Sequence, residues 1–418
     1  MINTQQRDHH VSNSWRKRKV QDMVCTSEVR QNGQLPVSEN KFAHWIPGQK
    51  VYVQRSFTLE SGVEMHNVPV AYMTWGTLSP RADNVIVVCH ALSGSADVGD
   101  WWKPLLGAGQ AFDTDQFFVI CMNSLGSPYG TASPVTAKNG DPAEGWYGAD
   151  FPSTTIRDDV RLHRSLLNEL GVRRVAAVVG GSMGGMHALE WAYEGKGYVC
   201  CIVAIATCAY QGAWAIGWGE TQRHAIYYDP KFHGGRYSLD DPPVGGLESA
   251  RMAALLTYRS RDALEHRFSR QGYEGKEKGA TAKHMHKTQP PKIATPSSSP
   301  TFVVQSYLRY QAKKFTHRFD SNCYLALTHK LDSHDVARGR ADTIADALAL
   351  IEQPTLVLGI KSDGLYTYAD QEELARSIPN AALREIVSED GHDAFLIESR
   401  QINDILKGFW NDHLRDII

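Results

Sequence analysis

Residues 180–184 contain a serine in a setting that suits a nucleophile. The segment Gly180-Gly181-Ser182-Met183-Gly184 fits the pattern G-x-S-x-G, follows the apolar run 175–179 and precedes a helical pattern at 186–192. A strand, a tight turn and a helix lift the serine hydroxyl above the sheet, and the glycines let neighbouring chain pass close to it. We therefore predict that Ser182 is a nucleophile and that the Met183 N–H, at the helix N-terminus, faces a developing oxyanion. A Gly-rich phosphate loop or a plain turn is the alternative for this segment.

A serine hydroxyl needs a base that takes its proton and a carboxylate that orients the base. Asp363 follows the apolar run 355–360, and His392 follows the strand-like run 383–387. Both stand just past a strand, in the order acid and then histidine that a hydrolase-type sheet requires after the serine. The spacing predicts Asp363 as the acid and His392 as the base.

Other side chains near these positions are weaker candidates. Glu389 and Asp390 are alternatives for the acid, but they lie too close to the histidine in sequence. His90 opens the loop 90–95 after the apolar run 84–89, where a structural loop histidine is a better interpretation than a base. The same loop offers the second oxyanion donor, for which the Leu92 N–H is the candidate.

The strands that must position these groups appear as short apolar runs rich in β-branched residues, at 84–89, 117–122, 174–179, 199–206 and 355–360. Continuous apolar runs are typical of strands buried on both faces of a parallel sheet. Between them, a helical pattern over 156–170 starts with a capping box at Thr155 and Asp158 and ends at Gly171. This alternation predicts the α/β class, with a mostly parallel sheet flanked by helices.

The alternation breaks between residues 210 and 335. Helical stretches at 247–258 and 302–318 have no buried strand between them, so we predict a helical insertion at 210–335 in a core formed by 46–209 and 336–418. Within the insertion, residues 271–300 are polar and rich in Pro, Ser and Lys, which predicts a mobile surface loop. A metal-binding tract is the less favoured interpretation of His284 and His286 there.

Residues 1–45 are polar and show no periodicity, with a basic cluster at 16–19. A secretory signal would need an apolar stretch after those basic residues, and a mitochondrial presegment would be poor in acid, whereas Asp8, Asp22, Glu28 and Glu39 interrupt this one. We predict a disordered N-terminal tail.

Composition excludes several classes of protein. The 418 residues include 44 Lys and Arg against 46 Asp and Glu, so the chain lacks the basic excess of a nucleic-acid binder. Mean hydropathy is -0.36, and no apolar run approaches the roughly 18–20 residues that span a bilayer. The seven cysteines are odd in number and form no CxxC pair, which argues against a disulfide framework and a zinc site. We predict a soluble cytoplasmic protein with no metal and no membrane or nucleic-acid partner.

Six segments resemble the homoserine O-acetyltransferase family of the α/β-hydrolase superfamily. They are CHALSGSADVGDWW (89–102), NSLGSPYGTASP (123–134), GGSMGGMHALEWA (180–192), ETQR (220–223), SDGLY (362–366) and GHDAFL (391–396). The resemblance covers about 50–418, outside the tail and the 271–300 loop. It implies an α/β-hydrolase fold with an inserted helical lid, a homodimer, and ping-pong acetyl transfer to homoserine in methionine biosynthesis. Acetyl-CoA would be a co-substrate, with no permanently bound cofactor.

The same resemblance implies residue roles. Ser182, Asp363 and His392 match the catalytic triad, and Arg223 and Asp393 match the family's substrate-binding arginine and aspartate. An arginine and an aspartate suit homoserine, because a guanidinium can bind the homoserine carboxylate and a carboxylate can bind the homoserine ammonium.

Alternatives to homoserine acetylation remain open at this stage. A simple esterase shares the acyl-enzyme, deacetylcephalosporin C acetyltransferase resembles the same family, and serine as acceptor or succinyl-CoA as donor would fit the same chemistry. A non-catalytic binding protein of this fold is disfavoured, because all three triad residues are present.

Overall fold

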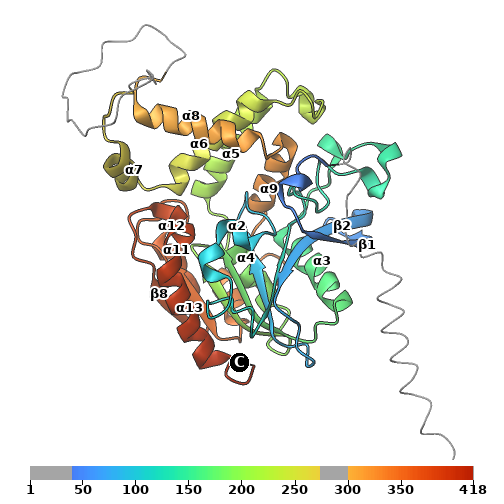
Figure 1. Ribbon diagram of the computed structural model, residues 1–418, viewed down its shortest axis with the longest axis vertical. Helices are drawn as coiled ribbons and strands as arrows, with labels where there is room; N and C mark the ends of the chain where they lie inside the picture. Colours follow the sequence, from blue (N-terminus) through green and yellow to red (C-terminus); the bar gives the residue numbers. More distant parts are fainter. Residues whose placement is uncertain (1–39, 274–299, 418) are drawn as a thin grey trace, which may run out of the picture.

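The computed structural model describes residues 40–273 and 300–417, and its centre is an eight-stranded sheet in the order β1-β2-β4-β3-β5-β6-β7-β8 (Figure 1). The strands are β1 (Lys50–Thr58), β2 (Glu64–Trp75), β3 (Val85–Cys89), β4 (Phe118–Met122), β5 (Val175–Gly181), β6 (Val199–Ile205), β7 (Thr355–Gly359) and β8 (Ala381–Glu385). β2 pairs with β1 and β4 in antiparallel fashion, and the other neighbours pair in parallel. The predicted α/β class with a mostly parallel sheet is confirmed.

The apolar-run criterion did not reveal β1 and β2. These two strands are the first two at one side of the sheet; β1 has one buried residue, Phe57, and exposed residues interrupt the buried ones of β2. The parallel strand β3, in contrast, is buried at every position. A strand with one solvated face lacks the continuous apolar run on which the sequence prediction relied.

Helices cover both faces of the sheet, because successive side chains of a strand point to opposite sides. Val85 and Val87 of β3 belong to one core cluster and Ile86 and Val88 to another. On the first face lie α3 (Ile156–Glu169), α4 (Met183–Ala192), α10 (Ile344–Ala349) and α11 (Tyr368–Ser377), and on the second lie α2 (Val98–Trp101), α12 (Ala394–Ile397) and α13 (Ser399–His413). The capping box at Thr155, which starts α3, is confirmed.

Between β6 and α10, the described residues form α-helices that Figure 1 shows gathered on one side of the sheet. They are α5 (Ala213–Tyr227), α6 (Val244–Tyr258), α7 (Arg261–Phe268), α8 (Val303–Thr316) and α9 (Ser321–Asp332). Their core cluster includes Phe315 and Tyr324 together with Met183 and Met186 of α4. The insertion therefore rests on the helix that follows Ser182.

Most of the predicted 271–300 loop, with His284 and His286, lies outside the described residues. Its two described ends pair with each other. The Tyr273 N–H donates to the Thr301 carbonyl at 2.7 Å, and the Val303 N–H donates to the Gln271 carbonyl at 3.1 Å. The segment therefore leaves the insertion and returns to it at one place.

The structure corrects the predicted end of the N-terminal tail at residue 45. Phe42 and Ile46 are buried in the core cluster of the insertion, and Asn40 Nδ2 donates to the Pro128 carbonyl at 2.9 Å. The mostly apolar segment 42–46 is too short to show a periodicity, so the burial of Phe42 and Ile46 was not visible in the sequence. Residues 1–39 lie outside the described residues.

Candidate active site

Ser182 lies in a strained turn between β5 and α4. Its φ of 59° and ψ of -123° place it in a region that L residues rarely adopt, and its side chain does not cap the helix that it precedes. A Cβ on Gly180 would lie 2.1 Å from the Gly184 carbonyl oxygen, and one on Gly184 would lie 2.1 Å from the Cys89 carbonyl oxygen. Only glycine fits at both positions, as the sequence pattern predicts for this turn. The Met183 N–H belongs to the first turn of α4, where amides have no acceptor within the helix.

Asp363 and His392 are joined by a hydrogen bond of 2.7 Å between Oδ2 and Nδ1. The other carboxylate oxygen, Oδ1, accepts the N–H groups of Leu365 at 2.8 Å and Tyr366 at 3.1 Å, which fixes the carboxylate. Burial lowers the pKa of His392, but the adjacent Asp363 outweighs burial, and the pKa is raised above its ordinary value. The ring is therefore oriented through Nδ1 and made more basic.

The two alternative acids do not hold this ring. Asp390 pairs with Arg259 at 2.5 Å. Glu389 is 77% exposed and lies 3.8 Å from the ring of His266. The geometry favours Asp363 over both.

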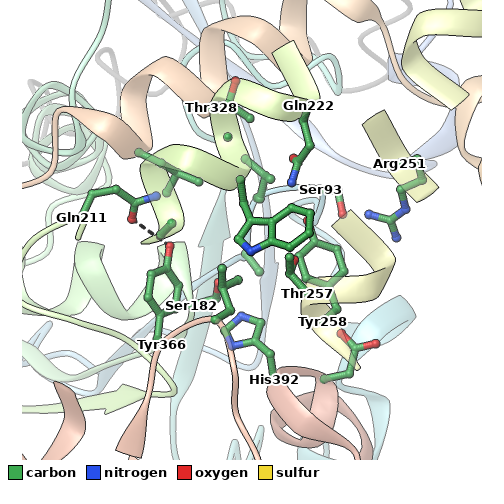
Figure 2. A pocket seen from close by; sticks show the side chains of 18 of the residues that line it. Ser93, Ser182, Gln211, Gln222, Arg251, Thr257, Tyr258, Thr328, Tyr366 and His392 are labelled. Atoms are coloured by element: carbon green, nitrogen blue, oxygen red, sulfur yellow. Dashed lines mark hydrogen bonds between the residues drawn. The ribbon is translucent and has the colours of Figure 1, made fainter. Parts of the chain in front are cut away.

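Ser182 and His392 open into one cavity of about 110 Å³. Figure 2 shows the His392 ring beside the Ser182 side chain. The cavity wall comes from the sheet domain and from the insertion, and it includes Leu92, Gln211, Trp218, Gln222, Arg251, Tyr258, Asp332, Tyr366 and Asp393. No hydrogen bond joins the Ser182 hydroxyl to the ring within the described residues, and such bonds often tighten only when substrate binds. The second ring nitrogen of His392, Nε2, can therefore take the proton of the Ser182 hydroxyl.

The loop after β3 places Leu92 on the cavity wall, with Ala91 and Ser93 beside it. His90 holds this loop in position, because Nδ1 bonds the Ala91 carbonyl at 2.8 Å and Nε2 accepts the Ser124 N–H at 3.1 Å. Burial lowers the pKa of His90 to about 4. Because the His90 ring is neutral and both of its nitrogens form hydrogen bonds, His90 has a structural role, as predicted from the sequence.

The structure corrects the choice of arginine. Arg223 is 3% exposed and bound by two carboxylates, Glu220 at 2.9 Å and Asp332 at 2.7 Å, and it does not line the cavity. Arg251 does line it, and Figure 2 shows its guanidinium reaching toward the cavity from α6. Among the described residues, Arg251 Nε and Nη1 are buried without a hydrogen-bond partner. Arg251 is therefore better placed than Arg223 to hold an anionic group.

The sequence carried a weak signal for Arg251. It is the one charged residue in the otherwise apolar stretch 250–256, on a helix that the pattern at 247–258 predicts. Arg223, in the ETQR segment, is an arginine on another helix of the same insertion. Which of the two reaches the cavity depends on how the helices pack, and the sequence pattern does not contain that information.

Asp393 lines the same cavity, directly after His392 in the chain. Burial raises the pKa of Asp393 above its ordinary value, while the positive charges of His392, Arg251 and Arg259 act in the opposite direction. A guanidinium and a carboxylate thus stand on the wall of the cavity that contains the serine and the histidine. This pair can receive a ligand that carries both a negative and a positive group.

Neither a metal site nor a membrane-spanning helix is found within residues 40–273 and 300–417. No three His, Cys, Asp or Glu side chains form a group that could hold a metal ion. No helix in these ranges is long and apolar enough to cross a bilayer.

Comparisons with known proteins agree with this geometry. Residues 84–399 match the family model described as alpha/beta hydrolase fold. The crystal structure of esterase E22 superposes with a TM-score of 0.74 at 26% identity, covering 86% of this chain and 99% of that one. The protein therefore has the α/β-hydrolase fold.

Two curated relatives show to which family within this fold the chain belongs. The chain is 65% identical to homoserine O-acetyltransferase FUB5 of Gibberella fujikuroi, over 92% of both chains. It is 49% identical to homoserine O-acetyltransferase of Emericella nidulans, over 91% of this chain and 90% of the other. The chain belongs to the homoserine O-acetyltransferase family, which confirms the resemblance seen in its motifs.

Proposed function

We propose that the protein transfers the acetyl group of acetyl-CoA to the hydroxyl of L-homoserine, a step of methionine biosynthesis, through an acetyl-Ser182 intermediate. The observation that carries the proposal is one cavity that contains Ser182 and the Asp363–His392 pair together with Arg251 and Asp393. The relatives at 65% and 49% identity support the reaction and its substrates.

In the first half-reaction, His392 Nε2 takes the Ser182 proton while Oγ attacks the thioester carbonyl. The N–H groups of Met183 and Leu92 stabilise the tetrahedral oxyanion, each donor contributing on the order of 3 kcal/mol. When the carbon–sulfur bond breaks, the proton on His392 passes to the CoA thiolate. Ser182 then carries the acetyl group and His392 is neutral again.

In the second half-reaction, the homoserine hydroxyl gives its proton to His392 and attacks the acetyl carbonyl. The bond to Ser182 breaks and the proton returns to Oγ, which restores the free enzyme. Arg251 binds the homoserine carboxylate and Asp393 its ammonium, so that the hydroxyl end is left to face His392. This assigns to Arg251 the role that sequence analysis gave to Arg223.

A transferase must also keep water from the acetyl-enzyme, since water would release acetate. The insertion contributes Trp218, Arg251 and Tyr258 to the cavity wall opposite the sheet. We infer that it acts as a lid, limiting access of water while leaving room for the amino acid.

The cofactor, the oligomeric state and the location are also matters of proposal. Acetyl-CoA is a co-substrate, and we propose no permanently bound cofactor. The family resemblance supports a homodimer, which light scattering would test. We propose a cytoplasmic location, because the cysteines of the described residues are free thiols, as is usual in a reducing compartment.

The decisive assay incubates the protein with acetyl-CoA, with and without homoserine, and measures free CoA and O-acetylhomoserine. Transfer predicts homoserine-dependent CoA release with matching product. Equal CoA release in both samples without that product would instead indicate an esterase, the activity named for the structural neighbour. Serine, deacetylcephalosporin C and succinyl-CoA in parallel samples define the acceptor and the donor.

A further inference from the structure

The loop that carries the proposed base is docked on the turn between α6 and α7. A Cβ on Gly391, which has a φ of +73°, would lie 2.5 Å from the Ser260 backbone nitrogen, so the two backbones touch. The Ser260 hydroxyl donates to the Glu389 carbonyl, and Arg259 Nη2 lies 2.5 Å from Asp390 Oδ1. Contacts from residues 259–260 therefore fix residues 389–391, directly before His392.

Arg259 also reaches toward Asp393. Its side chain is 11% exposed, and Nη1 lies 3.9 Å from Asp393 Oδ2. The distance to Asp390 is much shorter, so Asp390 holds the guanidinium while Asp393 receives its charge without a close hydrogen bond. Asp393 keeps its oxygens for a ligand in the cavity and still has a cation beside it.

The charged groups around Asp393 come from two elements. His392 and Asp390 belong to its own loop, whereas Arg251 and the titratable Tyr258 belong to α6 and Arg259 directly follows α6. Arg251 lines the cavity, where the proposed carboxylate of homoserine would neutralise it, whereas Arg259 does not line the cavity. Arg259 is thus the cation that stays beside Asp393 when substrate is bound.

We infer that Arg259 is a positioning residue for acceptor recognition: anchored on Asp390, it holds its positive charge beside the Asp393 carboxylate that receives the ammonium of the amino acid. This inference rests on the proposed function, because it concerns the same acceptor site. It assigns no contact between Arg259 and substrate. Arg259 acts through Asp393, and the acyl donor does not depend on it.

The variant Arg259→Met tests this, with Arg261→Met as a matched control, since Arg261 is an exposed arginine two residues further on. We expect Arg259→Met to raise the KM for homoserine about tenfold at neutral pH, with the KM for acetyl-CoA unchanged. Loss of the guanidinium lets burial raise the pKa of Asp393 further. As the pH is lowered, Arg259→Met should therefore lose homoserine binding at a higher pH than wild type does. Arg259→Lys should restore part of the effect, and Arg261→Met should behave as wild type.

A second substrate separates this role from a general structural one. p-Nitrophenyl acetate acylates Ser182 without an ammonium group, so its pH profile should be the same in wild type and Arg259→Met. An unchanged homoserine KM and pH profile in Arg259→Met would overturn the inference, and so would equal losses with both substrates. Failure of the proposed function gives a different result, namely wild-type protein that forms no O-acetylhomoserine.

Discussion

The part of the chain that the structure describes contains two buried aspartate–histidine pairs of almost equal length. Asp363 and His392 are joined at 2.7 Å, and Asp159 and His187 at 2.9 Å. They differ in what the second ring nitrogen meets. His187 Nδ1 donates to the Met183 carbonyl at 2.8 Å, so both of its nitrogens donate to oxygen atoms, whereas the second nitrogen of His392 is left for the cavity.

The surroundings of the second pair show its role. Asp159 also binds the fully buried Lys330 of α9 at 2.5 Å and accepts the Leu125 N–H at 2.8 Å. Burial raises the pKa of Asp159, but Lys330 and His187 outweigh it and the net pKa is lowered. This cluster joins α3, α4 and α9, and it stabilises the packing of the insertion on the sheet domain. An aspartate–histidine pair can act as a base only where one nitrogen faces a cavity that also contains the nucleophile.

The largest effect is expected for Ser182→Ala. Removal of one hydroxyl should lower acetyl-CoA turnover by at least about 10⁴-fold while the fold survives, because little packing is lost. CoA release and thermal unfolding measured together check both parts. Near-normal turnover would refute covalent catalysis at this serine.

Substitution of the two histidines tests the comparison itself. His392→Gln should lower turnover about 10³-fold with a small change in stability, because a general base is lost. His187→Gln should lower the free energy of unfolding by about 1–3 kcal/mol, because the buried Asp159 carboxylate and Met183 carbonyl lose hydrogen bonds, with turnover per folded molecule within about tenfold of wild type. Denaturant unfolding and kcat of each variant give the two readouts. Equal turnover losses in the two folded variants would show that the comparison is wrong.

A smaller effect is expected for Arg251→Met. A charged hydrogen bond to the homoserine carboxylate should be lost, raising the KM for homoserine roughly 10–100-fold with the KM for acetyl-CoA little changed. Steady-state kinetics with each substrate varied in turn would measure this. If Arg223→Met produced the selective rise instead, the original sequence assignment would stand.

The smallest effect is a shift in pH dependence. His392 must be neutral to take a proton, and its pKa is raised above 6.5 by Asp363 despite burial. Acylation should therefore fall as the pH decreases through that raised pKa, about tenfold per pH unit below it. In Asp363→Asn the midpoint should move to lower pH. A wild-type midpoint below 6.5 would contradict the proposed ion pair.

Residues whose role depends on the ends of strands were predictable from the sequence. Ser182 and Asp363 follow buried strands, His392 follows the partly exposed edge strand β8, and parallel strands bring such ends to one edge of a sheet. The glycines of the elbow were predictable for a similar reason, because their contacts are set within one strand–turn–helix unit.

Residues whose role depends on the packing of the insertion were not predictable. Arg223 and Arg251 are both arginines on helices, and only the tertiary structure shows that the first is bound by two carboxylates and the second faces the cavity. The docking of Arg259 on Asp390 links residues far apart in the chain, and no local pattern marks it. The strands β1 and β2 were missed because polar residues interrupt their apolar ones, and residues 40–45 because the segment is short.

The central claim is that Ser182 carries the acetyl group between the two substrates. Mass spectrometry of the digested protein, after brief incubation with acetyl-CoA in the absence of homoserine, tests it most directly. We predict an acetyl group on the peptide that contains Ser182, and its disappearance with formation of O-acetylhomoserine when homoserine is added. Product formation with no acetylated Ser182 at any time, or acetylation confined to another residue, would contradict the account.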